Sequence, residues 1–273
     1  MPTSLSDVLQ VVQELWPVEN AESWDAPGLV TGDPSAPVER MLLAVDAVGV
    51  IIDEAIATES DLLLVHHPLL LRGVTSIAED RYKGSLLSRL IRADCALLAA
   101  HTNADIVERG TSAVLADAIG LVDALPIVPG AEPDTGLGRV GRLATPTTLG
   151  RLARALAELL PATASGIRVS GEYDAPVETI ALCGGAGDSL LGHPEVTAAD
   201  VYITADLRHH PASESREQAV LGGRGPALID VSHWASEWLW LDAAAEQLRS
   251  ALPELEVTVS DLRTDPWDFV IVQ

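Results

Sequence analysis

The chain has 273 residues, of which 48% are hydrophobic, and its 40 acidic and 17 basic side chains give a net charge of −23. This length can bury a sizeable core, as one large domain or as two lobes. The negative field repels polyphosphate backbones and disfavours nucleic acid as a partner, and no apolar run reaches the roughly 18 residues of a membrane-spanning helix.

The N-terminus and the two cysteines favour a cytoplasmic protein. The first residues, MPTSLSDVLQ, contain neither the basic region nor the apolar region of a secretory signal. Cys95 and Cys183 each lie within an apolar run. This placement predicts buried thiols in a reducing compartment, without a disulfide framework.

Apolar runs alternate with helical patterns in the N-terminal half. A helix is predicted over residues 5–15, capped by Thr3 or Ser4 and stopped by Pro17. A loop rich in Gly, Pro and Asp follows, and then come strands and helices in alternation: strand 40–48, helix 49–60, strand 61–67, helix 84–94 and a strand from residue 95. These strands are continuous apolar runs, which is typical of an α/β sheet buried on both faces.

The composition changes in the second half. Residues 126–148 are dense in Pro, Gly and Thr and predict a linker or a surface excursion, which suggests two lobes. Beyond it the pattern predicts these elements: helix 149–160, strands 166–171 and 177–183, a helix after the GGAGDSLL turn, strand 200–205, strand 226–231, a long helix from residue 233, and a last strand at 255–261.

Six of the seven histidines lie just past apolar strands. The strand exits carry these candidate residues: His66 and His67; His101, Asn103 and Asp105; His209 and His210; His233 and Glu237. In open α/β sheets, binding sites form outside the carboxyl ends of the strands. The clustering therefore predicts one site built from several exits.

The residue types at these exits suit a metal centre. Imidazole and carboxylate ligands suit Zn, Fe, Mn, Co or Ni. His233 and Glu237, at i and i+4, share one helix face, and the adjacent His66 and His67 can diverge at a strand end toward two metals. A carboxylate such as Glu237 can bridge such a pair, and two metals roughly 3.5–4 Å apart activate water and hold a substrate oxygen.

Each motif also has a structural alternative. The two histidines of HHP can hydrogen-bond a loop, HTNAD can be a turn, and SHWASE can be a capped helix start. The glycines of GGAGDS can cradle a phosphate, although they more often let a strand turn tightly into a helix. His193 lies away from the exits, and a solvated helix face explains the four arginines at 139, 142, 151 and 154 more simply than a basic patch.

Taken together, these motifs resemble the Nif-three-like dinuclear metal centre family, whose members are often described as GTP cyclohydrolase 1 type 2 homologues. The matching stretches are SWDAPGLVTGD, LLLVHHPLLLRG, AAHTNAD, CGGAGDSLL, YITADLRHH and DVSHWASEW. They occur in the family's order over residues 23–238, and the HHP, HTNAD and SHWASE elements together are highly specific.

The resemblance implies an α/β fold of two lobes, with mostly buried sheets flanked by helices. The first lobe would comprise residues 1–128 and 228–273 and carry the metal ligands, and the second would comprise residues 129–227. A toroidal homohexamer with metal sites facing an internal cavity is also implied.

The resemblance also implies two divalent metal ions per chain and a set of ligands. By position, His67 and Asp105 would bind one metal, His66 and His233 the other, and Glu237 would bridge both. His101 and His210 fall where the family places further polar residues near the metals, so they are the acid–base candidates. Ala26-Pro27 and Thr204-Ala205-Asp206 depart from the family pattern, but neither departure touches the five ligand positions.

The function implied is that of a metal-dependent hydrolase acting on a small molecule, with a nucleotide as the family's example. In the GTP cyclohydrolase 1 type 2 reaction, a metal-bound hydroxide would attack the purine C8 of GTP and yield dihydroneopterin triphosphate and formate. A phosphoesterase, or another amidohydrolase acting on a small molecule, uses the same metal chemistry and fits equally well. A non-catalytic metal-binding assembly with a regulatory or partner-binding role also stays open, because nothing in the sequence reads a guanine edge.

Overall fold

The computed structural model describes residues 2–272, which fold as two compact units. Unit 1 comprises the chain up to Ala104 together with Leu241–Thr264. Unit 2 comprises Asp105–Trp240 and the residues from Asp265 onward. Helix α9 (His233–Ala251) begins in unit 2 and ends in unit 1.

Unit 1 is built on a five-stranded sheet with the order β1-β4-β3-β2-β13. Its strands are β1 (Gly28–Thr31), β2 (Arg40–Asp46), β3 (Leu62–His67), β4 (Ala96–Ala99) and β13 (Glu256–Val259). All neighbours are parallel except β1, which runs antiparallel to β4. Parallel strands need both faces covered, and the central strands are indeed almost fully buried, as their unbroken apolar sequences predict.

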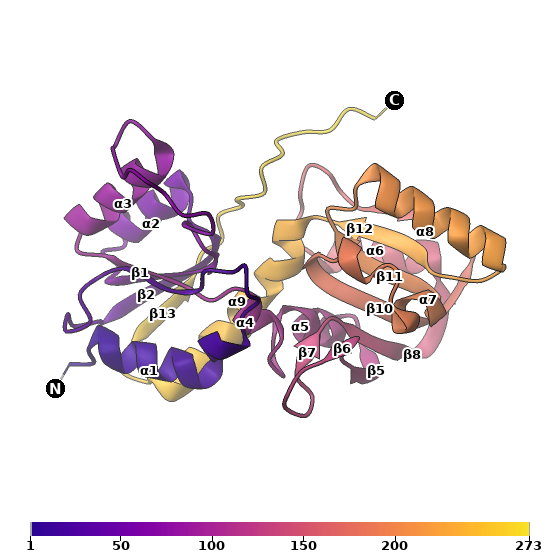
Figure 1. The fold of residues 1–273 in the computed structure, drawn as a ribbon, viewed down its shortest axis with the longest axis horizontal. Helices are drawn as coiled ribbons and strands as arrows, with labels where there is room; N and C mark the ends of the chain where they lie inside the picture. The colour runs from indigo at the N-terminus through magenta and orange to yellow at the C-terminus, as the bar shows by residue number, and fades with distance from the viewer. Residues whose placement is uncertain (1, 273) are drawn as a thin grey trace. The chain divides into compact units, whose positions relative to one another are not determined.

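Helices flank both faces of this sheet (Figure 1). Helices α2 (Gly49–Ala57) and α3 (Tyr82–Arg92) pack on one face and share a continuous apolar core with β2, β3 and β4. The other face is covered by α1 (Leu5–Leu15) and the later part of α9, with the short 3-10 helix η1 (Val18–Asn20) after α1. Helix α1 begins and ends as predicted, because Ser4 and Asp7 form a capping box and the helix closes before Pro17.

Unit 2 is built on a six-stranded sheet with the order β5-β8-β10-β11-β12-β9. Its strands are β5 (Leu121–Leu125), β8 (Arg139–Thr148), β9 (Arg168–Ser170), β10 (Pro176–Ala186), β11 (Val201–Ala205) and β12 (Ala227–Val231), and a separate hairpin pairs β6 (Val128–Pro129) with β7 (Gly136–Leu137). The central strands β10, β11 and β12 are parallel, and the outer strands pair antiparallel. The helices are α4 (Thr102–Asp105), which crosses the unit boundary, α5 (Thr111–Ala118), α6 (Leu149–Leu159), the 3-10 helix η2 (Asp188–Leu190), α7 (Pro194–Ala198) and α8 (His209–Gly222).

Two segments of unit 2 differ from the sequence-based expectation. Much of the expected linker at 126–148 is the long strand β8, which pairs with both β5 and β10. Proline does not break this strand, because Pro146 lies within a register shift where residues 143–146 face Glu178. Helix α8 is not evident in the sequence, because none of its side chains is buried and no apolar stripe marks it.

The unit boundaries also fall at other residues than the expected 128 and 228. Strand β5 precedes residue 128 but pairs with β8, and β12 extends beyond residue 228 but pairs with β11, so both belong to the sheet of unit 2. Apolar periodicity identifies strands, but it carries no information about which sheet a strand joins. Within residues 2–272, no helix has the length and apolarity to cross a membrane.

The two cysteines are free and buried, as their apolar surroundings predict. Burial raises the pKa of each thiol to about 12, so both are protonated at neutral pH. Their role is packing within the cores, and a thiolate ligand for a metal is not expected at either position.

We expect the free energy of unfolding to fall in alkali because of these thiols. An exposed thiol in the unfolded chain ionises near 9.0, whereas the buried thiols hold their protons to about 12, so in this window the unfolded state binds fewer protons and is favoured as the pH rises. Denaturant titrations at about pH 8 and about pH 10 measure the fall. The Cys95→Ala, Cys183→Ala double variant should lose less stability between these two pH values than the unmodified protein. An equal loss would show that the two thiols do not cause the fall.

Candidate metal centre

Three parallel strands of unit 1 deliver polar side chains to one edge of its sheet. β2 ends at Asp46, β3 ends at His66 and His67, and β4 is followed by His101. Asp46 and His67 are direct partners in the β2–β3 register. The strand exits therefore gather in space, as the sequence pattern predicts.

The three histidines form a cluster that can hold a metal ion. His66, His67 and His101 each offer one ring nitrogen, and these atoms lie within 4.8 Å of one another. The ring centroids are 5.1–5.4 Å apart. His101, an acid–base candidate in the sequence, is thus placed among the possible ligands.

Each of these imidazoles is held through Nδ1. His67 donates its Nδ1–H to Asp46 Oδ1 at 2.7 Å, and His101 donates to Asp25 Oδ1 at 2.8 Å. His66 donates to the carbonyl oxygen of Ala100 at 2.8 Å, since a carbonyl only accepts. Donation from Nδ1 fixes the tautomer in which Nε2 carries the lone pair, and it also fixes the ring orientation, as in metal-binding histidines.

The carboxylate of Asp25 is built to stay ionised. Its side chain is fully buried, and it accepts hydrogen bonds from His101 and from both the amide and the hydroxyl of Thr102. Burial raises the pKa of this carboxyl, but the hydrogen bonds from His101 and Thr102 outweigh burial and leave it lowered. Asp25 therefore acts as a fixed negative acceptor beneath His101.

Unit 2 carries a second set of candidate ligands, again at the ends of parallel strands. β10, β11 and β12 are in register at Ala186, Ala205 and Val231, and Asp206 and His233 follow the last two. His233 donates its Nδ1–H to Asp206 Oδ2 at 2.8 Å, and its Nε2 lies 3.0 Å from Glu237 Oε1. The helical i, i+4 spacing of His233 and Glu237 thus brings the two side chains together, as predicted.

The electrostatics of this set favour a cation. Burial lowers the pKa of His233, but the charges of Glu237 and Asp206 outweigh it and raise the pKa to about 11. The hydrogen bond from His233 in turn lowers the pKa of Asp206. The set holds a proton between Nε2 and a buried carboxylate, and a divalent metal fits the same nitrogen and oxygen donors.

Gly185 makes room for these two side chains. Its φ is +66°, and a Cβ at this position would lie 2.4 Å from Glu237 Oε1 and 3.3 Å from His233 Nε2. Its amide donates to Ser236 Oγ at 3.0 Å. The phosphate-cradle alternative for GGAGDS gains no support, because the run continues β10 to Ala186 and then forms only a three-residue 3-10 helix.

The remaining sequence candidates lie as follows. Asp105 ends α4 and accepts a hydrogen bond from the Thr111 hydroxyl at 2.6 Å. His210 is exposed in the first turn of α8, where, among the described residues, its ring contact is with His209. His193 caps α7 by accepting from the Glu195 amide, which fits the structural role expected for it.

The arginines of the possible basic patch are used elsewhere. Arg139 is buried and donates to four backbone carbonyl oxygens. Arg142 pairs with Asp123, and Arg154 donates to the Tyr173 hydroxyl. Arg139, which is buried, is therefore not available to a phosphate backbone.

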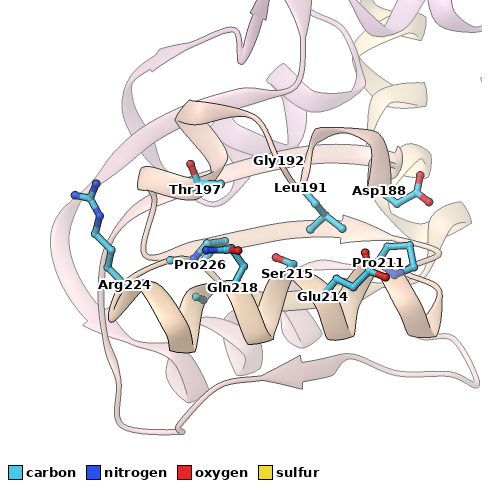
Figure 2. A pocket seen from close by; sticks show the side chains of 13 residues that line it. Asp188, Leu191, Gly192, Thr197, Pro211, Glu214, Ser215, Gln218, Arg224 and Pro226 are labelled. Atoms are coloured by element: carbon cyan, nitrogen blue, oxygen red, sulfur yellow. The ribbon is translucent and has the colours of Figure 1, made fainter.

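A groove of about 660 Å³ runs along α8 in unit 2. Its lining includes Asp188, Glu214, Ser215 and Arg224 (Figure 2), and no histidine or cysteine is among the described residues that line it. The groove therefore lacks the donor set of the candidate metal centre.

Sequence reasoning missed the residues that hold the histidines in place. Asp46, Asp25 and Asp206 each accept a hydrogen bond from an imidazole Nδ1. Two of them could have been found from their positions, since Asp46 ends one apolar strand and Asp206 follows another. Asp25 lies in a loop, and only the tertiary fold shows its partner.

Comparison with known proteins gives a consistent match over the whole chain. Residues 3–266 match the sequence model of the family described as Duf34/NIF3 (NGG1p interacting factor 3). A protein of Streptomyces coelicolor named "GTP cyclohydrolase 1 type 2 homolog" is 47% identical over 270 residues, which cover 96% of this chain and 93% of that protein. A Clostridium perfringens protein of the same name is 29% identical and covers 97% of this chain and 99% of its own length.

Solved structures share the fold. A Staphylococcus aureus hypothetical protein aligns with a TM-score of 0.88 at 26% identity, covering 99% of this chain and 100% of that chain. A Bacillus cereus protein described as related to NIF3 aligns with a TM-score of 0.87 at 22% identity, with the same coverage. The predicted α/β class, with sheets flanked by helices, is confirmed.

Proposed function

The chain belongs to the Duf34/NIF3 family, and from this premise we propose that it is a hydrolase that depends on two divalent metal ions and opens the purine ring of GTP. One observation carries the proposal: four histidines at strand exits each place Nδ1 on an oxygen acceptor. Metal-binding imidazoles are held in this way, with the acceptor fixing the tautomer and the ring. The name of the Streptomyces coelicolor relative supplies the substrate.

The proposed ligand assignment follows the family resemblance. His67 and Asp105 would hold one metal, His66 and His233 would hold the other, and Glu237 would serve as a ligand to both. The contact of His233 with Glu237 supports the placement of these two side chains at one metal. Imidazole and carboxylate donors admit Zn, Fe, Mn, Co or Ni.

When bound, a metal pair supplies Lewis acidity for activating water and polarising the substrate. The chain's own part is to position donors and to move a proton. We assign proton transfer to His101, because the hydrogen bond from its Nδ1 to Asp25 holds its ring beside His66 and His67. His210 is the weaker candidate, since it is exposed on α8 against His209.

The reaction proposed is GTP plus water giving dihydroneopterin triphosphate and formate. It opens the purine ring and releases C8 as formate, so formate release distinguishes it from phosphoester cleavage. Phosphate release from the same substrate would instead indicate a phosphoesterase.

We also propose that the chain assembles as a homohexamer, as the family resemblance implies. Exposed apolar side chains at the C-terminus support association, because Phe269, Ile271 and Val272 are 77–89% exposed in the single chain. Analytical ultracentrifugation of the full chain tests this part independently of activity.

The deciding experiment is elemental analysis of protein purified without chelator, followed by assay of the metal-loaded protein with GTP. We expect about two metals per chain and formate release. Two metals with phosphate release would indicate a phosphoesterase in place of the ring-opening reaction. Two metals with neither product would favour a non-catalytic metal-binding assembly. Less than about one metal per chain after reconstitution would overturn the metal centre itself.

A further inference from the structure

Trp24 is an exposed tryptophan beside the histidine cluster. It is 59% exposed, whereas Trp16 in the same unit is fully buried. Its ring centroid lies 5.9 Å from that of His101, with the rings nearly perpendicular at 78°. The indole therefore presents most of its surface to solvent within reach of the candidate site.

The loop that carries Trp24 is held on both sides. The amide of Glu22, two residues before Trp24, donates to Thr102 Oγ1 at 3.0 Å. Asp25, the residue after it, donates its amide to the carbonyl of Glu22 and accepts hydrogen bonds from His101 and Thr102. A ligand that contacts the indole therefore does not have to order the loop first.

The charge of the chain indicates which part of a nucleotide such an indole would bind. With a net charge of −23, the protein field opposes a phosphorylated ligand, so affinity has to come from the metals and from uncharged contacts. A planar heteroaromatic base offers such a contact, because it stacks on an indole face whatever its edge pattern. Stacking needs no hydrogen bonds to the edge of the base, which is consistent with a sequence in which no guanine-recognition motif is evident.

We propose that Trp24 is a stacking platform for the purine base of the substrate, held beside His101 by the Asp25 loop. The inference rests on the proposed function, since it names how the same site takes hold of its nucleotide. Trp24 is a binding residue: it orients the base ring relative to the histidine cluster and takes no part in proton transfer.

The test compares guanosine 5′-monophosphate with ribose 5-phosphate, in which a hydroxyl group replaces the base, by calorimetry on the metal-loaded protein. In Trp24→Ala we expect the affinity for guanosine 5′-monophosphate to fall by about tenfold or more, and in Trp24→Phe by about threefold or less, since phenylalanine keeps a ring for stacking. The affinity for ribose 5-phosphate and the metal content should stay unchanged in both variants. Trp267→Ala, which removes an exposed tryptophan of the C-terminal tail, is the matched control.

Three results of the binding experiment would overturn the platform. They are an equal loss of affinity for both probes in Trp24→Ala, unchanged affinity for guanosine 5′-monophosphate in that variant, and no binding of this probe to the unmodified protein. The hydrolase proposal fails separately: binding that depends on Trp24 without formate release keeps the platform and removes the reaction. Formate release with an unchanged KM for GTP in Trp24→Ala keeps the reaction and removes the platform.

Discussion

Replacing both His66 and His67 with alanine is expected to reduce the metal content from about two ions per chain to nearly none, and each single replacement should remove about one. The reason is the assignment of each imidazole to a different metal. In His67→Ala the carboxylate of Asp46 also loses one of its hydrogen-bond donors and keeps the hydroxyl of Thr264. Elemental analysis of the purified variants, after reconstitution with excess metal, measures the loss.

The chain contains its own control for this experiment. His209 and His210 are also adjacent histidines after a strand, with ring centroids 5.2 Å apart, close to the 5.1 Å of His66 and His67. Both are exposed on α8 and, within residues 2–272, neither is held by a carboxylate in the way His67 is. The His209→Ala, His210→Ala variant should keep about two metals. The assignment fails if the His66, His67 variant keeps two metals, or if both double variants lose them equally.

Much of the candidate site could be predicted from sequence because it obeys a rule of local order. Parallel strands place their carboxyl ends along one edge, so residues that follow apolar runs gather without any knowledge of the strand order. His66, His67 and His101 were found in this way, and His233 with Glu237 from helical spacing. The oxygen acceptors of the imidazole hydrogen bonds were harder to predict. Asp25 and His101 are 76 positions apart in the sequence, and no local sequence pattern extends over that separation.

The fold, like the site, could be predicted only where local sequence patterns determine it. Strands β2, β3 and β4 can be recognised in the sequence as continuous apolar runs, because both faces of their sheet are covered. Strand β8 is only partly buried and carries Pro146, so its membership depends on pairing with β5 and β10 rather than on its own composition. Sheet membership is a non-local property, which is why the expected unit boundaries differ from those of the structure.

Gly185→Ala is expected to weaken metal binding by about 10–100-fold while the protein stays folded. A methyl group at this position would approach Glu237 Oε1 to 2.4 Å, and Glu237 is only 3% exposed, so the carboxylate cannot move away into solvent. The substitution also forces a non-glycine residue to adopt a φ of +66°, which costs about 1–2 kcal/mol of stability. Metal titration and denaturant unfolding of the same preparation separate the two effects.

The neighbouring glycine separates a displaced carboxylate from a general disturbance of β10. A Cβ at Gly184 would lie 3.4 Å from Thr111, an ordinary van der Waals contact, and its φ is not in the left-handed region. Gly184→Ala should therefore bind metal as the unmodified protein does. If both variants lose metal equally, β10 has been distorted and the Gly185 result says nothing about Glu237. If Gly185→Ala keeps its affinity, Glu237 tolerates a displaced position, and its role as the bridging ligand has to be given up.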